Sequence, residues 1–148
     1  MYNHSKLRQE FWTNFGQYMA PVISANGEKR NWINYKTGLR HVYFKMDAGR
    51  QGALIGIHLR HADLDERSRV YERFRSLKDL LEEMIGESWT WERSAVDENG
   101  QSYARIFTEL KDRNIFHRDD WPEIISFFKS RMIALDLFWS QAKDILEA

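Results

Sequence analysis

The second half of the chain contains two acids and a lysine in an order that resembles the Mg²⁺-binding motif of restriction-type nucleases. Asp97 is followed by Glu109-Leu110-Lys111, a superficial Asp…Glu-x-Lys pattern. Two carboxylates that share a metal ion must lie within coordination distance of the same point. The strand pattern instead places Asp97 in a turn and Glu109 near the far end of the same hairpin, roughly 30 Å away at about 3.3 Å per residue. We therefore interpret the match as coincidental.

A second group, His58, His61 and Asp63, has side chains that ligate metal ions. Positions 58 and 61 differ by an odd number, so on a strand their side chains point to opposite faces, and ordinary cross-strand contacts are the simpler interpretation. The chain has no cysteine, which excludes disulfides, thiolate metal sites and a Cys nucleophile. It also has no nucleophile elbow, phosphate-binding glycine loop or dinucleotide fingerprint. We therefore predict neither metal nor cofactor, and nothing in the sequence indicates catalysis.

Aromatic and basic side chains alternate with apolar ones in the predicted strands, a pattern that could bind single-stranded nucleic acid. Rings stack on bases, and cations pair with phosphates. Residues 29–61 contain seven Lys or Arg and one acid. Exposed strand faces also carry Tyr, Lys and Arg simply because these suit a wet pleated surface, so both interpretations stay open. The candidate binding face comprises His41, Tyr43, Lys45, His58, Arg60, Tyr103, Arg105 and Phe107.

Two hairpins would position these side chains, and alternation together with turn length predicts the register of each. The first turns at residues 49–52. Its inner face pairs Val42 with Leu59 and Phe44 with Ile57, and its outer face pairs Tyr43 with His58 and His41 with Arg60. The second turns at residues 97–100. It pairs Trp91 with Ile106 and Trp89 with Thr108 on the inner face, and Glu92 with Arg105 on the outer face.

Three helices are predicted around the hairpins. The first covers about residues 6–19, the second about residues 64–85, and the third begins at Asp120 and continues almost to the end. Asp63 is the expected N-cap of the second helix, and Gly86 is its expected C-terminal stop.

The predicted order is therefore α-ββ-α-ββ-α, in a single domain over residues 1–148. We expect an α+β fold with one antiparallel sheet of four strands, helices packed on one face and a long C-terminal helix. Residues 32–35 are a candidate fifth strand, with Lys36-Thr37-Gly38 as a turn.

The last predicted helix carries a wider apolar stripe than one sheet face requires. Its apolar residues follow alternating spacings of four and three, which is a heptad seam. The stripe either packs across the sheet and both other helices, or offers a surface for self-association or for a protein partner. The candidate partner residues are Trp121, Phe128, Met132, Leu135 and Trp139.

Composition narrows the class of protein. The hydrophobic fraction of 43% and aromatic fraction of 14% favour a folded globule. The net charge of zero argues against nucleic-acid binding by bulk electrostatics, although residues 1–63 carry nine bases against four acids. No signal peptide or apolar run of membrane-spanning length is present, so we expect a soluble cytoplasmic protein without a membrane partner.

Three landmarks carry a family resemblance. They are EFWTNFGQYMAP, NWINYKTGLRHVYFKMD and WPEIISFFKSRMIALDLFW, at residues 10–21, 31–47 and 121–139. With the spacing between them, they resemble the bacterial family catalogued as domain of unknown function 4268, from about Leu7 to Glu147. Some longer members look like a nuclease-type or restriction-associated domain followed by this module. The resemblance implies an accessory role in DNA processing or defence, and it transfers no catalytic residue to this chain.

Two functions follow as hypotheses. The first is a non-enzymatic accessory module that binds nucleic acid or a nuclease-type protein through the candidate binding face. The alternative is a protein-interaction or homo-oligomerisation module that uses the last helix. A small-molecule enzyme would need a deep pocket with convergent polar groups, which the sequence does not indicate.

Overall fold

The computed structural model describes residues 4–147 and has the predicted α+β architecture. The long second helix of the prediction is divided in two, and a short 3₁₀ turn precedes the last helix. The elements in chain order are α1 (His4–Met19), β1 (Val42–Ala48), β2 (Gly52–Leu59), α2 (Leu64–Ser76), α3 (Lys78–Ile85), β3 (Thr90–Val96), β4 (Ser102–Lys111), η1 (Arg118–Asp120) and α4 (Trp121–Glu147).

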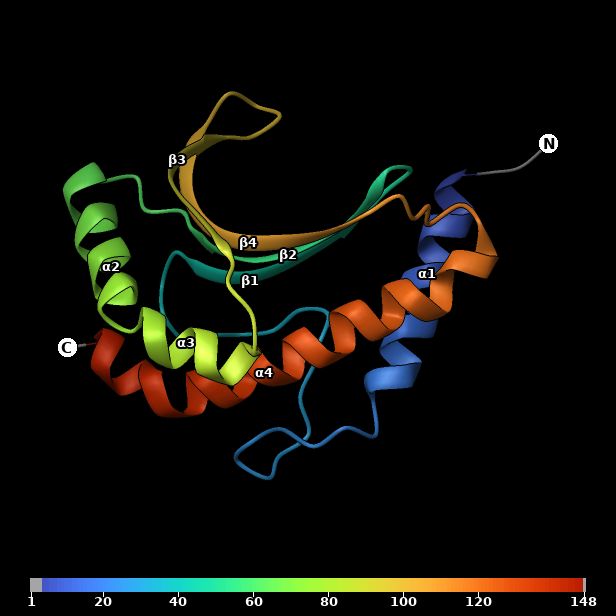
Figure 1. Ribbon diagram of the computed structural model, residues 1–148, viewed down its shortest axis with the longest axis horizontal. Helices are drawn as coiled ribbons and strands as arrows, with labels where there is room; N and C mark the ends of the chain where they lie inside the picture. The colour runs from blue at the N-terminus through green and yellow to red at the C-terminus, as the bar shows by residue number, and fades with distance from the viewer. Residues whose placement is uncertain (1–3, 148) are drawn as a thin grey trace.

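The four strands form one antiparallel sheet in the order β1-β2-β4-β3. The two hairpins therefore join through β2 and β4, and β1 and β3 are the edges. Figure 1 shows α3 and α4 beneath the sheet, while both hairpins curl away from these helices. The sheet consequently has an inner face against the helices and an outer, concave face that no helix covers.

The predicted register of the first hairpin is confirmed along its whole length. Val42 pairs with Leu59, and Phe44 pairs with Ile57. All four side chains are buried, because strict alternation puts every second residue of both strands on the helix-facing side.

The second hairpin follows the predicted register only at the end distant from its turn. Glu92 faces Arg105 as predicted, but a bulge after Glu92 shifts the pairing, so that Ala95 lies opposite Tyr103. An inserted residue of this kind bends a strand and increases its twist, in keeping with the upward curl of β3 and β4 in Figure 1. Trp89, expected opposite Thr108, is buried but precedes β3.

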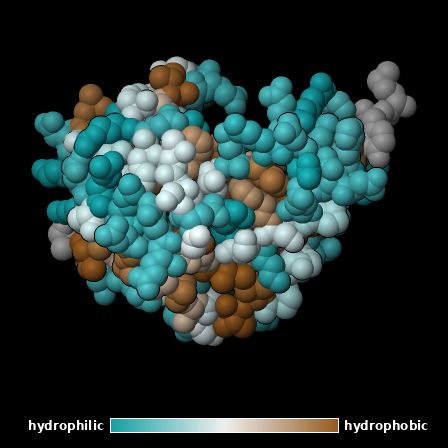
Figure 2. All heavy atoms as spheres, viewed as in Figure 1, coloured by the Kyte–Doolittle hydropathy of each residue, from teal (hydrophilic) through white to brown (hydrophobic). Residues whose placement is uncertain are grey.

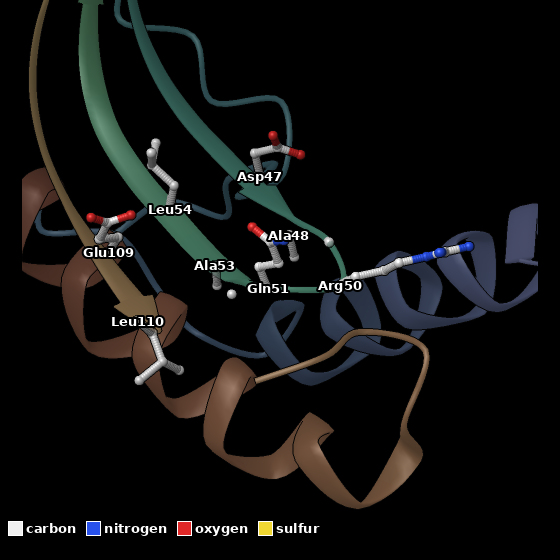
Figure 3. A pocket seen from close by; sticks show the side chains of 10 residues that line it. Asp47, Ala48, Arg50, Gln51, Ala53, Leu54, Glu109 and Leu110 are labelled. Atoms are coloured by element: carbon white, nitrogen blue, oxygen red, sulfur yellow. The ribbon is translucent and has the colours of Figure 1, made fainter. Parts of the chain in front are cut away.

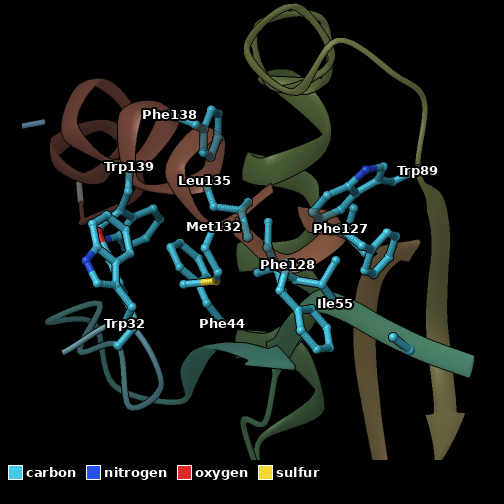
Figure 4. Packing of buried hydrophobic residues seen from close by; sticks show 14 of the residues in the cluster. Trp32, Phe44, Ile55, Trp89, Phe127, Phe128, Met132, Leu135, Phe138 and Trp139 are labelled. Atoms are coloured by element: carbon cyan, nitrogen blue, oxygen red, sulfur yellow. The ribbon is translucent and has the colours of Figure 1, made fainter. Parts of the chain in front are cut away.

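The core lies between the inner sheet face and the helices. Figure 4 shows side chains of α4 pointing toward Phe44 and Ile55 of the sheet. The Phe44 ring meets the Trp139 ring edge to face, with centroids 5.4 Å apart. Large side chains from three helices are fully buried there, each stabilising the fold by about 2 to 3 kcal/mol through burial: Phe11, Phe15, Phe74, Phe128 and Phe138.

The predicted helix over residues 64–85 is interrupted at Leu77, whose φ of −106° and ψ of 16° are not helical. Both predicted ends are confirmed. The Asp63 carboxylate accepts from the first-turn amides of α2, and Gly86 ends α3 with a left-handed φ of 81°. Because the apolar stripe continues across Leu77, periodicity alone gave no sign of the break.

The candidate strand at residues 32–35 is wrong, since the chain turns there. Trp32 and Tyr35 are buried, but their polar atoms bond to distant groups. The Trp32 indole donates to the carbonyl of Val22 at 3.1 Å, and the Tyr35 hydroxyl donates to Asp136 of α4 at 2.6 Å. The segment is therefore held by side-chain contacts to the α1–β1 connection, to α4 and to Phe44 of β1, and not by strand pairing.

Asp136 is a buried carboxylate that ties the α1–β1 connection to α4. Its Oδ2 accepts from the amide of Ala25 at 2.7 Å, and its Oδ1 accepts from Tyr35 and lies 3.5 Å from Nε of Arg30. Burial raises the pKa of Tyr35, and the hydrogen bond to Asp136 raises it further. We call the group Asp136, Tyr35, Arg30 and Ala25 the Asp136 latch.

No helix within residues 4–147 is long and apolar enough to cross a membrane.

Candidate nucleic-acid interface

Strand pairing places most of the candidate binding face in adjacent rows on the concave side of the sheet. Tyr43 pairs with His58, and His58 pairs with Arg105, so these three residues form one row across β1, β2 and β4. The next row contains Lys45, Gly56 and Phe107. Seen in the orientation of Figure 1, the outline of the molecule is notched between the tips of the two hairpins (Figure 2).

Tyr43 and Lys45 are the two most accessible of the candidate residues, since the others are half-buried or buried. The Tyr43 side chain is 41% exposed, and Nζ of Lys45 lies 5.3 Å from the centre of its ring. Lys45 has no carboxylate within 4.0 Å among residues 4–147. Edge strand β1 therefore presents an accessible ring beside an unpaired cation.

Tyr103 and Phe107 are not displayed as the sequence suggested. They are 7% and 8% exposed, and an arginine lies over each ring. Cζ of Arg60 is 4.0 Å from the centre of the Tyr103 ring, and Cζ of Arg105 is 3.8 Å from the centre of the Phe107 ring. At these positions the arginine side chains, 30% exposed for Arg60 and 22% for Arg105, are more accessible than the rings beneath them.

Both covering arginines are also paired with acids. Arg60 donates to Asp97 at 2.7 Å, and Arg105 donates to Glu92 at 3.0 Å across the strands. The hydrogen bond from Arg60 lowers the pKa of Asp97. The acids fix the orientation of the guanidinium groups and compensate their charges, so the face is less positive than its basic residues suggest.

His58 lies in the middle of these cations. Its ring centre is 4.9 Å from that of Tyr103, and its buried Nε2 has no hydrogen-bond partner in the described part of the chain. Burial lowers the pKa of His58 to about 4, and the charges of Arg60, Arg105 and Lys45 contribute in the same direction. The imidazole is therefore neutral at neutral pH.

His41 does not take its predicted place on the concave face. It precedes β1 with a left-handed φ of 68°. Its carbonyl accepts from the amide of Arg60 at 2.7 Å, and its ring lies 5.2 Å from that of buried His61. The predicted pairing of His41 with Arg60 is thus made by the backbone, while the side chain leaves the row.

The residues of the two patterns that resemble metal sites lie apart or have other structural roles. Asp97 is in the β3–β4 turn, whereas Glu109 lies near the opposite end of β4, as the geometric argument required. Asp63 accepts two amides as the cap of α2. Within residues 4–147, no three His, Asp or Glu side chains are grouped so that they could hold a metal ion.

A pocket of about 380 Å³ lies at the turn of the first hairpin (Figure 3). Its walls are the turn itself and the end of β4, including Asp47 and Glu109. Figure 3 shows the Arg50 side chain extending away from the pocket, where it contacts His4 at 2.9 Å. The pocket therefore offers two exposed carboxylates, of which Glu109 already lies 3.9 Å from Nζ of Lys111, and this arrangement supports no particular chemistry.

Comparison with known families decides the affiliation. The family model described as Domain of unknown function (DUF4268) matches residues 7–143, nearly the whole chain. The chain belongs to the DUF4268 family. No curated protein and no solved structure matches it. The DUF4268 affiliation supports the resemblance seen in the three sequence landmarks and assigns no functional residue.

In this DUF4268 chain, the candidate partner residues of the last helix all face the core. They are at most 5% exposed, so the heptad seam is covered by the sheet and by α1, α2 and α3, which leaves these side chains no surface to offer a partner in this fold. The five residues are Trp121, Phe128, Met132, Leu135 and Trp139.

Proposed function

We propose that this chain is a non-enzymatic binding module whose concave sheet face binds single-stranded nucleic acid. The observation that carries the proposal is a set of three planar groups, on partly exposed side chains, that lie on one uncovered sheet face. These groups are the ring of Tyr43 and the guanidinium planes of Arg60 and Arg105.

The stacked arginines suit unpaired bases. A base stacks on an arginine plane as well as on an aromatic ring. Here Tyr103 and Phe107 support the inner side of each guanidinium, while Asp97 and Glu92 hold its edge. The planes are thus fixed before a ligand arrives, which reduces the entropy lost on binding. The side chain of Arg60 is 30% exposed, and that of Arg105 is 22% exposed.

Compensated charge should make this binding depend mainly on stacking. Because Asp97 and Glu92 already pair with the two arginines, Lys45 is the main cation free to meet a phosphate. Each phosphate neutralised on a single strand contributes about −0.7 to the slope of log K against log salt. We therefore expect a slope between about −0.7 and −1.4, shallower than that of a strongly basic protein.

The nuclease-type domains expected in longer family members also favour binding of nucleic acid. A module that holds a displaced single strand would serve an enzyme that cuts or processes DNA. This role for the chain is part of the proposal.

Fluorescence anisotropy with labelled single-stranded and duplex oligonucleotides, at low and moderate salt, tests the proposal. The single strand should bind more tightly, since duplex bases are not available for stacking. Tyr43→Ala should weaken binding by about tenfold, because stacking contributes about 1 to 3 kcal/mol per base. Lys45→Ala should make the salt slope shallower by about 0.7.

The helices provide a matched control pair. Tyr18 is 52% exposed, and Nζ of Lys129 lies 4.8 Å from the centre of its ring, much as in the Tyr43–Lys45 pair. Tyr18→Ala and Lys129→Ala should leave oligonucleotide binding unchanged. The assignment would be overturned if neither the single-stranded nor the duplex oligonucleotide binds. It would also be overturned if the control variants lose as much affinity as Tyr43→Ala and Lys45→Ala.

A further inference from the structure

A second hollow, of about 470 Å³, lies away from the concave face, between the C-terminal end of α4, helix α2 and the segment that leads into β1. Figure 1 shows these three segments converging beside the C-terminus. The volume is within the range of small-molecule sites, about 300 to 1,000 Å³. Its apolar lining comes from Leu39, Val70 and Leu146.

Three arginines from two elements line this pocket: Arg40 before β1, and Arg69 and Arg73 on α2. The guanidinium groups of Arg40 and Arg69 make no hydrogen bond, ion pair or ring contact within residues 4–147. Every other arginine of that range bonds, pairs with an acid or lies over a ring. The two arginines without a partner thus lie at the same pocket.

A buried histidine completes the polar lining. His61 is 4% exposed, and its buried Nδ1 has no hydrogen-bond partner among the described residues. An unpaired buried polar atom of this kind costs about 1 to 3 kcal/mol. Burial also lowers the pKa of His61, so that the ring is neutral and one of its nitrogens can donate while the other accepts.

We propose that this pocket binds a small organic molecule through a phosphate group. A terminal phosphate carries up to two charges and three acceptor oxygens, so it can receive bonds from more than one guanidinium at once. Arg40 and Arg69 provide the unpartnered donors, and Arg73 keeps free donors after its bond to the carbonyl of Leu146 at 3.3 Å. The volume beyond the phosphate, with its apolar lining, would take the organic part.

Two carboxylates in the lining limit the strength of this site. Glu66 and Glu147 line the pocket, and neither lies within 4.0 Å of one of the three arginines. The lining therefore keeps one net positive charge while His61 is neutral. Removing a carboxylate should strengthen phosphate binding, and removing an arginine should weaken it.

Amide chemical shifts of the full chain, titrated with pyrophosphate, orthophosphate and succinate at constant ionic strength, test the proposal. Pyrophosphate should give saturable shifts around Arg40, His61 and Arg69, with a dissociation constant on the order of 1 mM or below. The double variant Arg40→Ala/Arg69→Ala should raise this constant at least about tenfold. Glu147→Gln should lower it by about threefold.

Arg75→Ala is the matched control, because Arg75 is an exposed arginine on α2 that lies over Trp91 outside the pocket. It should change the dissociation constant by less than about twofold. Lys45→Ala should also leave pyrophosphate binding intact, which separates this site from the concave face. Shifts that do not saturate, equal losses in Arg75→Ala, or binding of succinate without pyrophosphate would each overturn the phosphate assignment.

Discussion

His58 is the residue through which the concave face should respond to pH. Its pKa is about 4 in the folded chain, against 6.5 for an ordinary histidine. The unfolded chain therefore binds the proton more readily between these values, so stability is complete above about pH 6.5 and falls as the pH drops toward 4. The loss should reach about 3 kcal/mol. Urea unfolding at several pH values measures it.

His58→Gln supplies the control for this prediction, because glutamine does not titrate. The variant should lose the part of the stability change between pH 6.5 and 4 that His58 contributes, while the part from His61, whose pKa burial also lowers, and the acid transitions of the carboxylates stay. If wild type and variant show the same pH dependence over that window, the account of His58 is wrong.

Gly56 is required because β4 lies too close to it for a side chain to fit. A Cβ at this position would lie 2.8 Å from the carbonyl oxygen of Ile106 and 2.8 Å from Cβ of Phe107. Gly56→Ala should therefore cost about 1 to 3 kcal/mol of unfolding free energy, as overpacking usually does. Gly49→Ala is the matched control, since nothing lies within 4 Å of the added carbon there. Comparable midpoints of thermal unfolding for the two variants would contradict this reading.

At the residue scale, alternation predicted the face of each side chain but not its exposure. The pairing of Glu92 with Arg105 was predictable, because both lie in one hairpin. The pairing of Arg60 with Asp97 spans 37 positions and depends on how the two hairpins join, which local patterns do not contain. For that reason the covering of Tyr103 by Arg60 could not be foreseen.

At the element scale, the Asp136 latch holds the α1–β1 connection on α4. Asp136→Ala would leave the hydroxyl of Tyr35 and the amide of Ala25 without their acceptor. We expect a loss of about 2 to 3 kcal/mol in unfolding free energy, since a buried group loses its partner and Arg30 is only a quarter exposed. Chemical denaturation measures the loss.

Hydrogen exchange shows whether the loss is local to the latch. The Ala25 amide should exchange faster in Asp136→Ala, and the amides of β2 should change only as far as global stability changes. Asp144→Ala removes an exposed acid from the same helix and should do neither. An unchanged exchange rate at Ala25 in Asp136→Ala would show that the carboxylate does not hold this segment.

The helices and strands were predicted best where the alternation of apolar residues and the turn length indicated the same pairing. Both hairpins have alternating strands and defined turns, and most of their pairing followed. The break at Leu77 was missed because the apolar spacing of α2 and α3 is continuous through it. Residues 32–35 were misassigned because Trp32 and Tyr35 are buried by distant partners, so their apolar character indicated a core position and not a strand.

At the scale of the whole molecule, the joining of the hairpins through β2 and β4 could not be predicted, because each hairpin has two edges and neither carries a distinguishing signal. Part of the charge difference between the two halves is neutralised by ion pairs within the fold. Arg30 pairs with Asp136, and Arg60 pairs with Asp97, so bases of the first half meet acids of the second.

Mapping the backbone amide shifts of the chain on titration with an oligothymidylate of about eight nucleotides tests the central claim most directly. We predict saturable shifts in the row of Tyr43, His58 and Arg105 and in the adjoining row of Lys45 and Phe107, and none along the exposed face of α4. Shifts confined to the helices, or no saturable shift at any residue, would contradict the assignment of the concave face as the binding surface.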